Sequence, residues 1–104
     1  MIEDDVPEPE KLSLGLRLTL EAGPREERFR AAFPGLSEME LMSLTDICDN
    51  IVQTALDLGV AIIDRRIRQK DFEPRMTQIF PFLSDDDITL LLDAAMRAAT
   101  RAVK

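Results

Sequence analysis

The sequence contains no histidine, tyrosine or tryptophan, and its only cysteine is Cys48. Without histidine the chain has no side chain whose ordinary pKa lies near neutrality for general base catalysis, and it also has no glycine-rich loop to hold phosphate. A single cysteine excludes an internal disulfide and a cysteine zinc site, and it fits a reducing compartment. We therefore expect a protein that is not an enzyme and that binds no metal and no cofactor.

The chain also lacks any apolar run close to 18 residues, and its first residues are acidic where a signal peptide would be basic. These absences predict a cytoplasmic protein with no membrane partner. The formal net charge is −7, from 20 acidic and 13 basic residues. This charge disfavours nucleic acid as a partner, although a local basic face would still allow it.

A length of 104 residues, with 45% apolar and 32% charged side chains, fits one folded domain with one core. Residues 1–10 hold five acidic residues and two prolines but few apolar groups. Such a segment buries too little surface to offset its ordering entropy, so we expect a flexible acidic tail. The alternative is a docking arm for a basic partner. Residues 11–104 are predicted to form a single helical domain.

One short motif occurs twice in the chain. Residues 33–38 read Phe-Pro-Gly-Leu-Ser-Glu, and residues 80–85, 47 positions later, read Phe-Pro-Phe-Leu-Ser-Asp. We interpret the pair as a duplicated unit of a short helix, a Phe-Pro corner and a longer capped helix. The alternative is that a favourable helix start arose twice. The identities outside the motif are Glu26 with Glu73, Arg28 with Arg75, Leu44 with Leu91, Asp46 with Asp93, and Ala55 with Ala102.

The apolar periodicity predicts an all-α fold, a small helical bundle built from two related helix-hairpins over about 24–58 and 73–102. Short helices are expected at about 24–32 and 73–80, a long central helix at about 37–70 and a last helix at about 84–102. The central helix is predicted to continue through Gly59, because its apolar stripe keeps phase there. Members of this stripe follow a heptad spacing: Leu41, Leu44, Cys48, Ile51, Ala55, Leu58 and Ile62.

The segment over 12–20 has a different pattern, because leucine alternates with other residues at every second position. Alternation is typical of a strand, although leucine itself prefers helix. No second alternating run is present to pair with this strand, so we expect it to pair with its copy in a homodimer. The residues predicted for self-association are Leu12, Leu14, Leu16, Leu18 and Leu20.

The order of alternating segment, short helix, turn and longer helix over residues 12–58 resembles the ribbon-helix-helix family. That resemblance implies a DNA-binding regulator in which paired strands of a dimer enter the major groove. It would turn Ser13, Gly15, Arg17 and Thr19 towards the bases. A further alternative is an acidic mimic of nucleic acid that inhibits a nucleic-acid-binding protein, since residues 31–64 contain no lysine or arginine.

The function that we favour from the sequence is a non-catalytic protein–protein interaction module of the adaptor, chaperone or inhibitor type, active as a homodimer. Cys48 lies on the apolar stripe, where a buried thiol is unreactive. The candidate partner-binding residues are the four bases that follow the acidic stretch: Arg65, Arg66, Arg68 and Lys70. Their alternative interpretation is a solvated helix end of the charge that the helix dipole favours.

Overall fold

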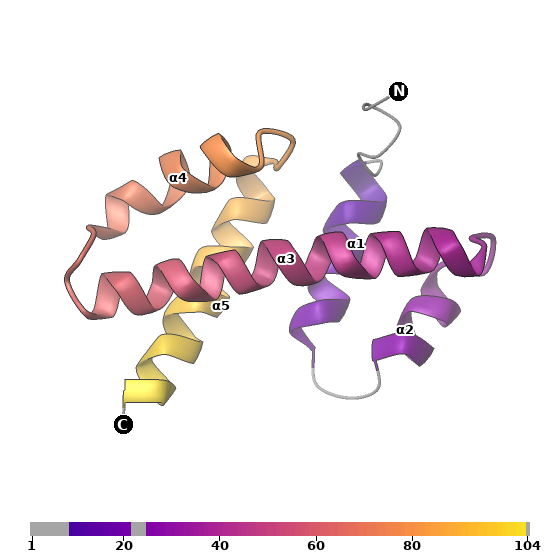
Figure 1. Ribbon diagram of the computed structural model, residues 1–104, viewed down its shortest axis with the longest axis horizontal. Helices are drawn as coiled ribbons and strands as arrows, with labels where there is room; N and C mark the ends of the chain where they lie inside the picture. Colours follow the sequence, from indigo (N-terminus) through magenta and orange to yellow (C-terminus); the bar gives the residue numbers. More distant parts are fainter. Residues whose placement is uncertain (1–8, 22–24, 104) are drawn as a thin grey trace. The chain divides into compact units, whose positions relative to one another are not determined.

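The computed structural model describes residues 9–21 and 25–103. These residues contain no strand, which confirms the all-α prediction (Figure 1). The elements in chain order are α1 (Pro9–Leu20), α2 (Arg25–Ala32), α3 (Glu38–Ile63), the 3-10 turn η2 (Gln69–Asp71), α4 (Phe72–Ile79) and α5 (Asp85–Val103). Of the predicted acidic tail, residues 1–8 lie outside the described residues, and Pro9 and Glu10 begin α1.

The chain divides into two compact units, Met1–Ile51 and Val52–Lys104. Since α3 runs without interruption from Glu38 to Ile63, its first half belongs to the first unit and its second half to the second. The first unit therefore contains α1, α2 and the first half of α3. The second contains the second half of α3, η2, α4 and α5. The prediction of a single domain over 11–104 stays a prediction, which the unfolding measurements below would test.

The structure corrects the prediction of a strand at 12–20, because these residues lie in helix α1. Leu12, Gly15 and Leu16 are buried, and their spacing of three and four places them on one helical face. Leu14, in contrast, is 39% exposed. The alternating pattern is therefore overridden by the helix preference of leucine and by packing at Gly15.

The core of the first unit forms where α1 meets α2 and the first half of α3. A Cβ atom on Gly15 would lie 2.7 Å from Cys48 Sγ and 3.5 Å from the Phe29 ring, so the helices approach closely because this residue is glycine. Phe29 and Phe33 are buried, with ring centroids 5.9 Å apart. Cys48 is fully buried, as predicted.

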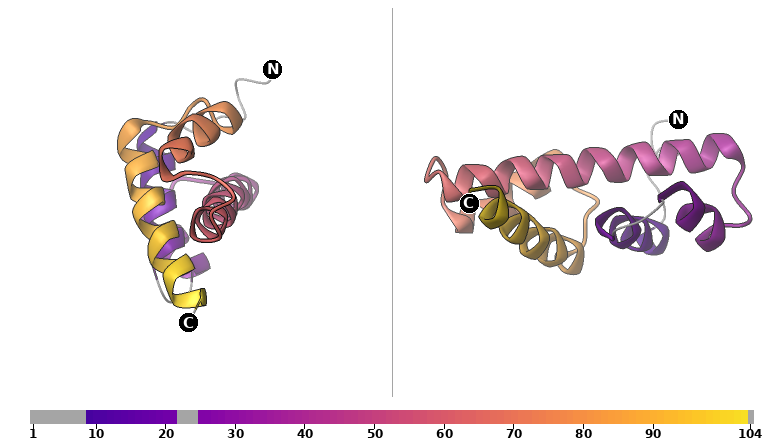
Figure 2. Two further views of the ribbon diagram at one scale, coloured as in Figure 1. Left: turned by 90° about the vertical axis from the view of Figure 1, so that its left-hand side faces the viewer. Right: turned by 90° about the horizontal axis from the view of Figure 1, so that it is seen from below.

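The core of the second unit forms where α5 packs on α4 and on the second half of α3. A Cβ atom on Gly59 would lie only 2.8 Å from the carbonyl oxygen of Ala95. The prediction of one helix through Gly59 is confirmed, and Figure 2 shows α3 as one unbroken helix. The largest side chains in this core are those of Phe72, Met76, Phe80, Leu83, Ile88 and Leu91.

The end of α3 differs from the prediction, because the helix stops at Ile63 and not near residue 70. The Arg66 N–H donates to the Ala61 carbonyl (2.8 Å) and the Arg65 N–H to the Ile62 carbonyl (3.0 Å). With Arg65 at φ 63°, these bonds form a Schellman motif, which ends a helix with one left-handed residue. Glycine usually fills that position, so the sequence carries no conventional stop signal here.

The two Phe-Pro corners form the same backbone hydrogen bonds at corresponding positions. In the first, the Phe33 N–H donates to Phe29 (2.9 Å) and the Leu36 N–H donates to Phe33 (3.2 Å). In the second, the matching bonds join Phe80 to Met76 (2.7 Å) and Leu83 to Phe80 (3.2 Å). Duplication and independent origin both predict this shared geometry, so duplication stays a prediction.

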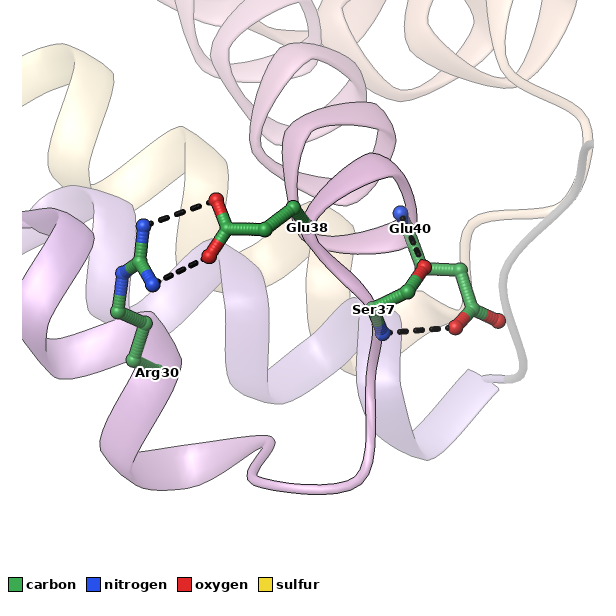
Figure 3. Close-up of polar contacts among 4 residues, drawn as sticks. All are labelled: Arg30, Ser37, Glu38 and Glu40. Atoms are coloured by element: carbon green, nitrogen blue, oxygen red, sulfur yellow. Dashed lines mark hydrogen bonds and ion pairs between the residues drawn. The ribbon is translucent and has the colours of Figure 1, made fainter.

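Capping boxes begin α3 and α5, at the serine of each copy of the repeated motif. The Glu40 N–H donates to Ser37 Oγ (3.2 Å), and the Ser37 N–H donates back to the Glu40 carboxylate (2.9 Å; Figure 3). Ser84 and Asp87 form the same reciprocal pair at 3.1 and 3.3 Å. Each box gives acceptors to two backbone N–H groups that a bare helix start would leave without partners.

Substitution of the first cap should have a measurable effect. We expect Ser37→Ala to lower the free energy of unfolding by about 1 kcal/mol, because the N–H groups of the first turn of α3 lose an acceptor. Ser84→Ala is the matched variant in the second unit and should cost about as much. Urea unfolding followed by circular dichroism measures both, and a Ser37→Ala variant as stable as the parent would contradict the capping role.

The cap also predicts a pH dependence. The hydrogen bond from the Ser37 backbone, and then that with its side chain, lowers the pKa of Glu40 below its ordinary value. A depressed carboxylate pKa adds stability at neutral pH that is lost as the pH falls through that pKa. The stability difference between the parent and Glu40→Gln should therefore be present at neutral pH and shrink in acid, and a difference independent of pH would contradict this.

Candidate docking groove

The first unit contains a groove between α2 and the first half of α3, with a volume of about 340 Å³. We call it the α2–α3 groove. Its lining residues follow the helical repeat on both helices, so each helix presents one face to it. The lining residues from α2 are Glu26, Phe29 and Arg30, and those from α3 are Glu38, Leu41, Met42, Thr45 and Asp46.

The apolar part of the groove includes both buried and exposed side chains. Phe29 is 1% exposed and Leu41 is half-buried, whereas Met42 is 64% exposed. One turn earlier on α3, Met39 is 78% exposed. The hydroxyl of Thr45 donates to the Leu41 carbonyl (2.7 Å), so the hydrogen-bond donor of this side chain is already used within α3. Met39 and Met42 therefore form an apolar ridge beside the groove that the first unit leaves uncovered.

The charged part of the groove is mainly acidic. Arg30 forms an ion pair with Glu38 across the start of α3, and its second N–H group donates to Glu38 at 3.0 Å (Figure 3). This hydrogen bond, with the charge of Glu38, raises the pKa of Arg30 above its ordinary value. Asp46 forms no ion pair with any residue that the structure describes, and it leaves the groove with uncompensated negative charge.

The second unit has polar residues at the positions that correspond to the exposed methionines. Shifted by the 47-residue offset, Met39 corresponds to Asp86 and Met42 to Thr89, both exposed. The start of α5 therefore folds with polar residues at the two positions where the start of α3 has methionine. Folding of the helix start does not require the two methionines, which points to another role for them.

Sequence reasoning did not identify this groove. Its signal was present, because aligning the two copies of the motif places Met39 over Asp86 and Met42 over Thr89. The heptad stripe predicts only which face of α3 is buried, whereas Met39 and Met42 are exposed. A difference in polarity between two otherwise matching copies is the pattern that would have revealed the site.

The predicted basic cluster follows α3 and lies in the second unit. Its four members are exposed: Arg65 and Arg66 lie in the motif that ends α3, Arg68 precedes η2, and Lys70 lies in η2. The Arg66 guanidinium forms an ion pair with the Asp64 carboxylate (3.5 Å), and the Arg68 backbone N–H donates to the Asp71 carboxylate (3.2 Å). The four bases are therefore accessible, and none of them is among the residues that line the α2–α3 groove.

The five leucines predicted for self-association are divided by α1 between core and surface. Leu12 and Leu16 are 1% and 0% exposed, so they belong to the core of the first unit. Leu14 is exposed, and Leu18 and Leu20 are half-buried. Because residues 9–20 form α1, the described structure also lacks the strand that the ribbon-helix-helix resemblance requires.

No family model, curated protein or solved structure matches this chain. Among the described residues, no helix is long and apolar enough to cross a membrane. The same part of the chain has no cluster of three or more histidine, cysteine or acidic residues that could hold a metal ion.

Proposed function

We propose that this protein is a non-catalytic protein–protein interaction module, of the adaptor, chaperone or inhibitor type, that binds its partner through the α2–α3 groove. The observation that carries the proposal is the exposure of Met39 and Met42 beside an open groove. Large apolar side chains grouped at the surface are typical of sites that bind another protein. Methionine suits such a site because its flexible side chain adapts to different partner surfaces.

The contrast with the second unit supports this assignment. Asp86 and Thr89 at the corresponding positions give the second helix start a polar surface. Because the corner and the cap have the same hydrogen bonds in both units, the methionines are not needed to build them. A second contact, for an acidic part of the same partner, is offered by the four exposed bases Arg65, Arg66, Arg68 and Lys70.

The test exchanges the two surfaces while leaving the fold intact. The full chain carrying Met39→Asp and Met42→Thr is compared with the parent as bait in a lysate of its source cells. We expect the variant to retain at most about one-tenth of the partner that the parent captures, because buried apolar anchors dominate binding energy at interfaces. Quantitative mass spectrometry measures the captured proteins.

A matched control changes the corresponding surface of the second unit, with Asp86→Ala and Thr89→Ala. This control should capture the same partner as the parent. Equal capture by the parent and by the methionine variant would contradict the groove as the binding site. Charge reversal of Arg65, Arg66, Arg68 and Lys70 forms a third arm, and unchanged capture there would remove the basic cluster from the proposal.

A homodimer located in the cytoplasm completes the proposed function. Leu14 supports self-association because it is 39% exposed, whereas Leu12 and Leu16 on the same helix are buried. We expect light scattering to give the mass of a dimer for the parent and of a monomer for Leu14→Lys. A monomeric parent, or a Leu14→Lys variant that remains dimeric, would remove Leu14 from the interface.

A further inference from the structure

We propose that the occupant of the α2–α3 groove is an amphipathic helix with basic side chains beside its apolar face, an inference that rests on the proposed function. The groove has an apolar floor at Phe29, an uncovered apolar ridge at Met39 and Met42, and acidic residues on both helices. Each of these three features selects one property of the occupant.

The apolar ridge selects an apolar face. Met42 is 64% exposed, and Met39, three residues earlier, is 78% exposed, so the two side chains follow one another along α3. The buried Phe29 ring forms the base between the two helices. An occupant that inserts a row of aliphatic side chains covers Met42 and Met39 together and removes both from water.

The backbone of the groove walls selects a helix over an extended peptide. Both walls are α-helices, whose main-chain groups are bonded within each helix, and the Thr45 hydroxyl already donates to Leu41. An extended peptide would therefore find no sheet edge here to satisfy its own N–H and C=O groups. A helix satisfies these groups internally and needs only side-chain contacts.

The charge of the groove selects basic flanks. Glu26, Glu38 and Asp46 line it against the single base Arg30, which is held by Glu38. No lysine or arginine occurs anywhere from residue 31 to residue 64. The Asp46 carboxylate has no ion-pair partner among the described residues, so it is available to a lysine or arginine of the occupant.

The experiment uses the full chain with labelled methionine methyl groups and a synthetic amphipathic helix of leucine and lysine as the probe. Two control peptides are an acidic version with glutamate in place of lysine, and a version of the same composition whose order abolishes the apolar face. We expect the basic amphipathic peptide to shift the methyl signals of Met39 and Met42. The signals of Met76 and Met96, in the second unit, should not move.

Charge variants separate the groove from general attraction to an acidic protein. Asp46→Lys should weaken binding of the basic peptide by about tenfold, whereas Asp93→Lys, the same change at the corresponding position of α5, should change it little. Higher salt should weaken binding to the parent more than binding to Asp46→Lys. Met39→Asp with Met42→Thr removes the two reporting methyl groups, so calorimetric titration measures peptide binding to this variant, and we expect its affinity for the basic amphipathic peptide to fall at least about tenfold.

The outcomes distinguish this inference from the proposed function. Equal binding of the acidic or scrambled peptide, or equal weakening by Asp46→Lys and Asp93→Lys, overturns the basic amphipathic helix as occupant. If the natural partner is nevertheless lost with the Met39→Asp and Met42→Thr variant, the interaction function survives with another occupant. If capture of that partner does not depend on the methionines, the proposed function itself fails.

Discussion

Phe29→Ala is expected to lower the free energy of unfolding by about 3–5 kcal/mol, because it removes a fully buried ring from the core of the first unit. Phe29 is 1% exposed, lies beside Gly15 where α1 approaches, and packs against Phe33 with the two rings tilted by 45°. Among the buried side chains described in the first unit only that of Phe33 is as large, and Phe33 is 8% exposed, so the cavity left by alanine at Phe29 would be among the most costly there. Such a loss is a large part of the total stability of a small domain.

Urea unfolding followed by far-ultraviolet circular dichroism measures this effect at low temperature. Ile79→Ala, at a 53% exposed position of α4, is the control and should cost far less. A Phe29→Ala variant within about 1 kcal/mol of the parent would contradict the packing described here.

The same measurement tests the prediction of one domain over 11–104. Met76 is the counterpart of Phe29 in the second unit and is fully buried, so Met76→Ala should cost about 2–5 kcal/mol. If α3 couples the two units, both variants shift one transition. If Phe29→Ala produces two transitions, the units unfold separately and the single-domain prediction is wrong.

Gly59→Ala is expected to cost about 1–3 kcal/mol, although alanine favours a helix over glycine by about 1 kcal/mol. The added Cβ would lie 2.8 Å from the Ala95 carbonyl oxygen and 3.0 Å from its carbonyl carbon. Backbone atoms of a packed helix cannot turn away, so α5 must move from α3. A thermal or urea unfolding curve for Gly59→Ala tests this, and a stabilised variant would contradict the close approach.

Gly15→Ala offers an informative comparison, because its obstacle is a side chain and not a backbone. There the new Cβ would lie 2.7 Å from Cys48 Sγ. We expect Gly15→Ala to destabilise the first unit and Cys48→Ala, added to it, to restore part of the loss by removing the sulfur. No such rescue should follow when Cys48→Ala is combined with Gly59→Ala.

The parts of the fold that could be predicted from sequence are those determined by neighbouring residues. Ser37 and Ser84 cap their helices through bonds that span three residues, so the local sequence predicts them correctly. The end of α3 could not be predicted, because the apolar pattern continues past Ile63 and Arg65 occupies a left-handed position that usually signals itself with glycine. The alternating leucines predicted a strand at 12–20, whereas these residues lie in α1, where Gly15 packs closely against Cys48 on α3.

The candidate site was harder to predict than the fold for a related physical reason. A periodic pattern identifies which face of a helix is buried, but it does not show which exposed positions border a groove. Met39 and Met42 are visible as unusual only when their exposure is known or when they are compared with Asp86 and Thr89. The basic cluster at Arg65 was conspicuous in sequence because charge is local information, and its role in binding stays a prediction.

Docking of a partner protein in the α2–α3 groove is tested most directly by photo-crosslinking in the source cells, with a photoreactive amino acid in place of Met42. The matched variant carries the same amino acid in place of Thr89, the corresponding exposed position on α5. We expect irradiation to yield a discrete adduct with a partner protein from position 42 and none of that adduct from position 89. An adduct formed equally from both positions, or from position 89 alone, would contradict the α2–α3 groove as the docking surface.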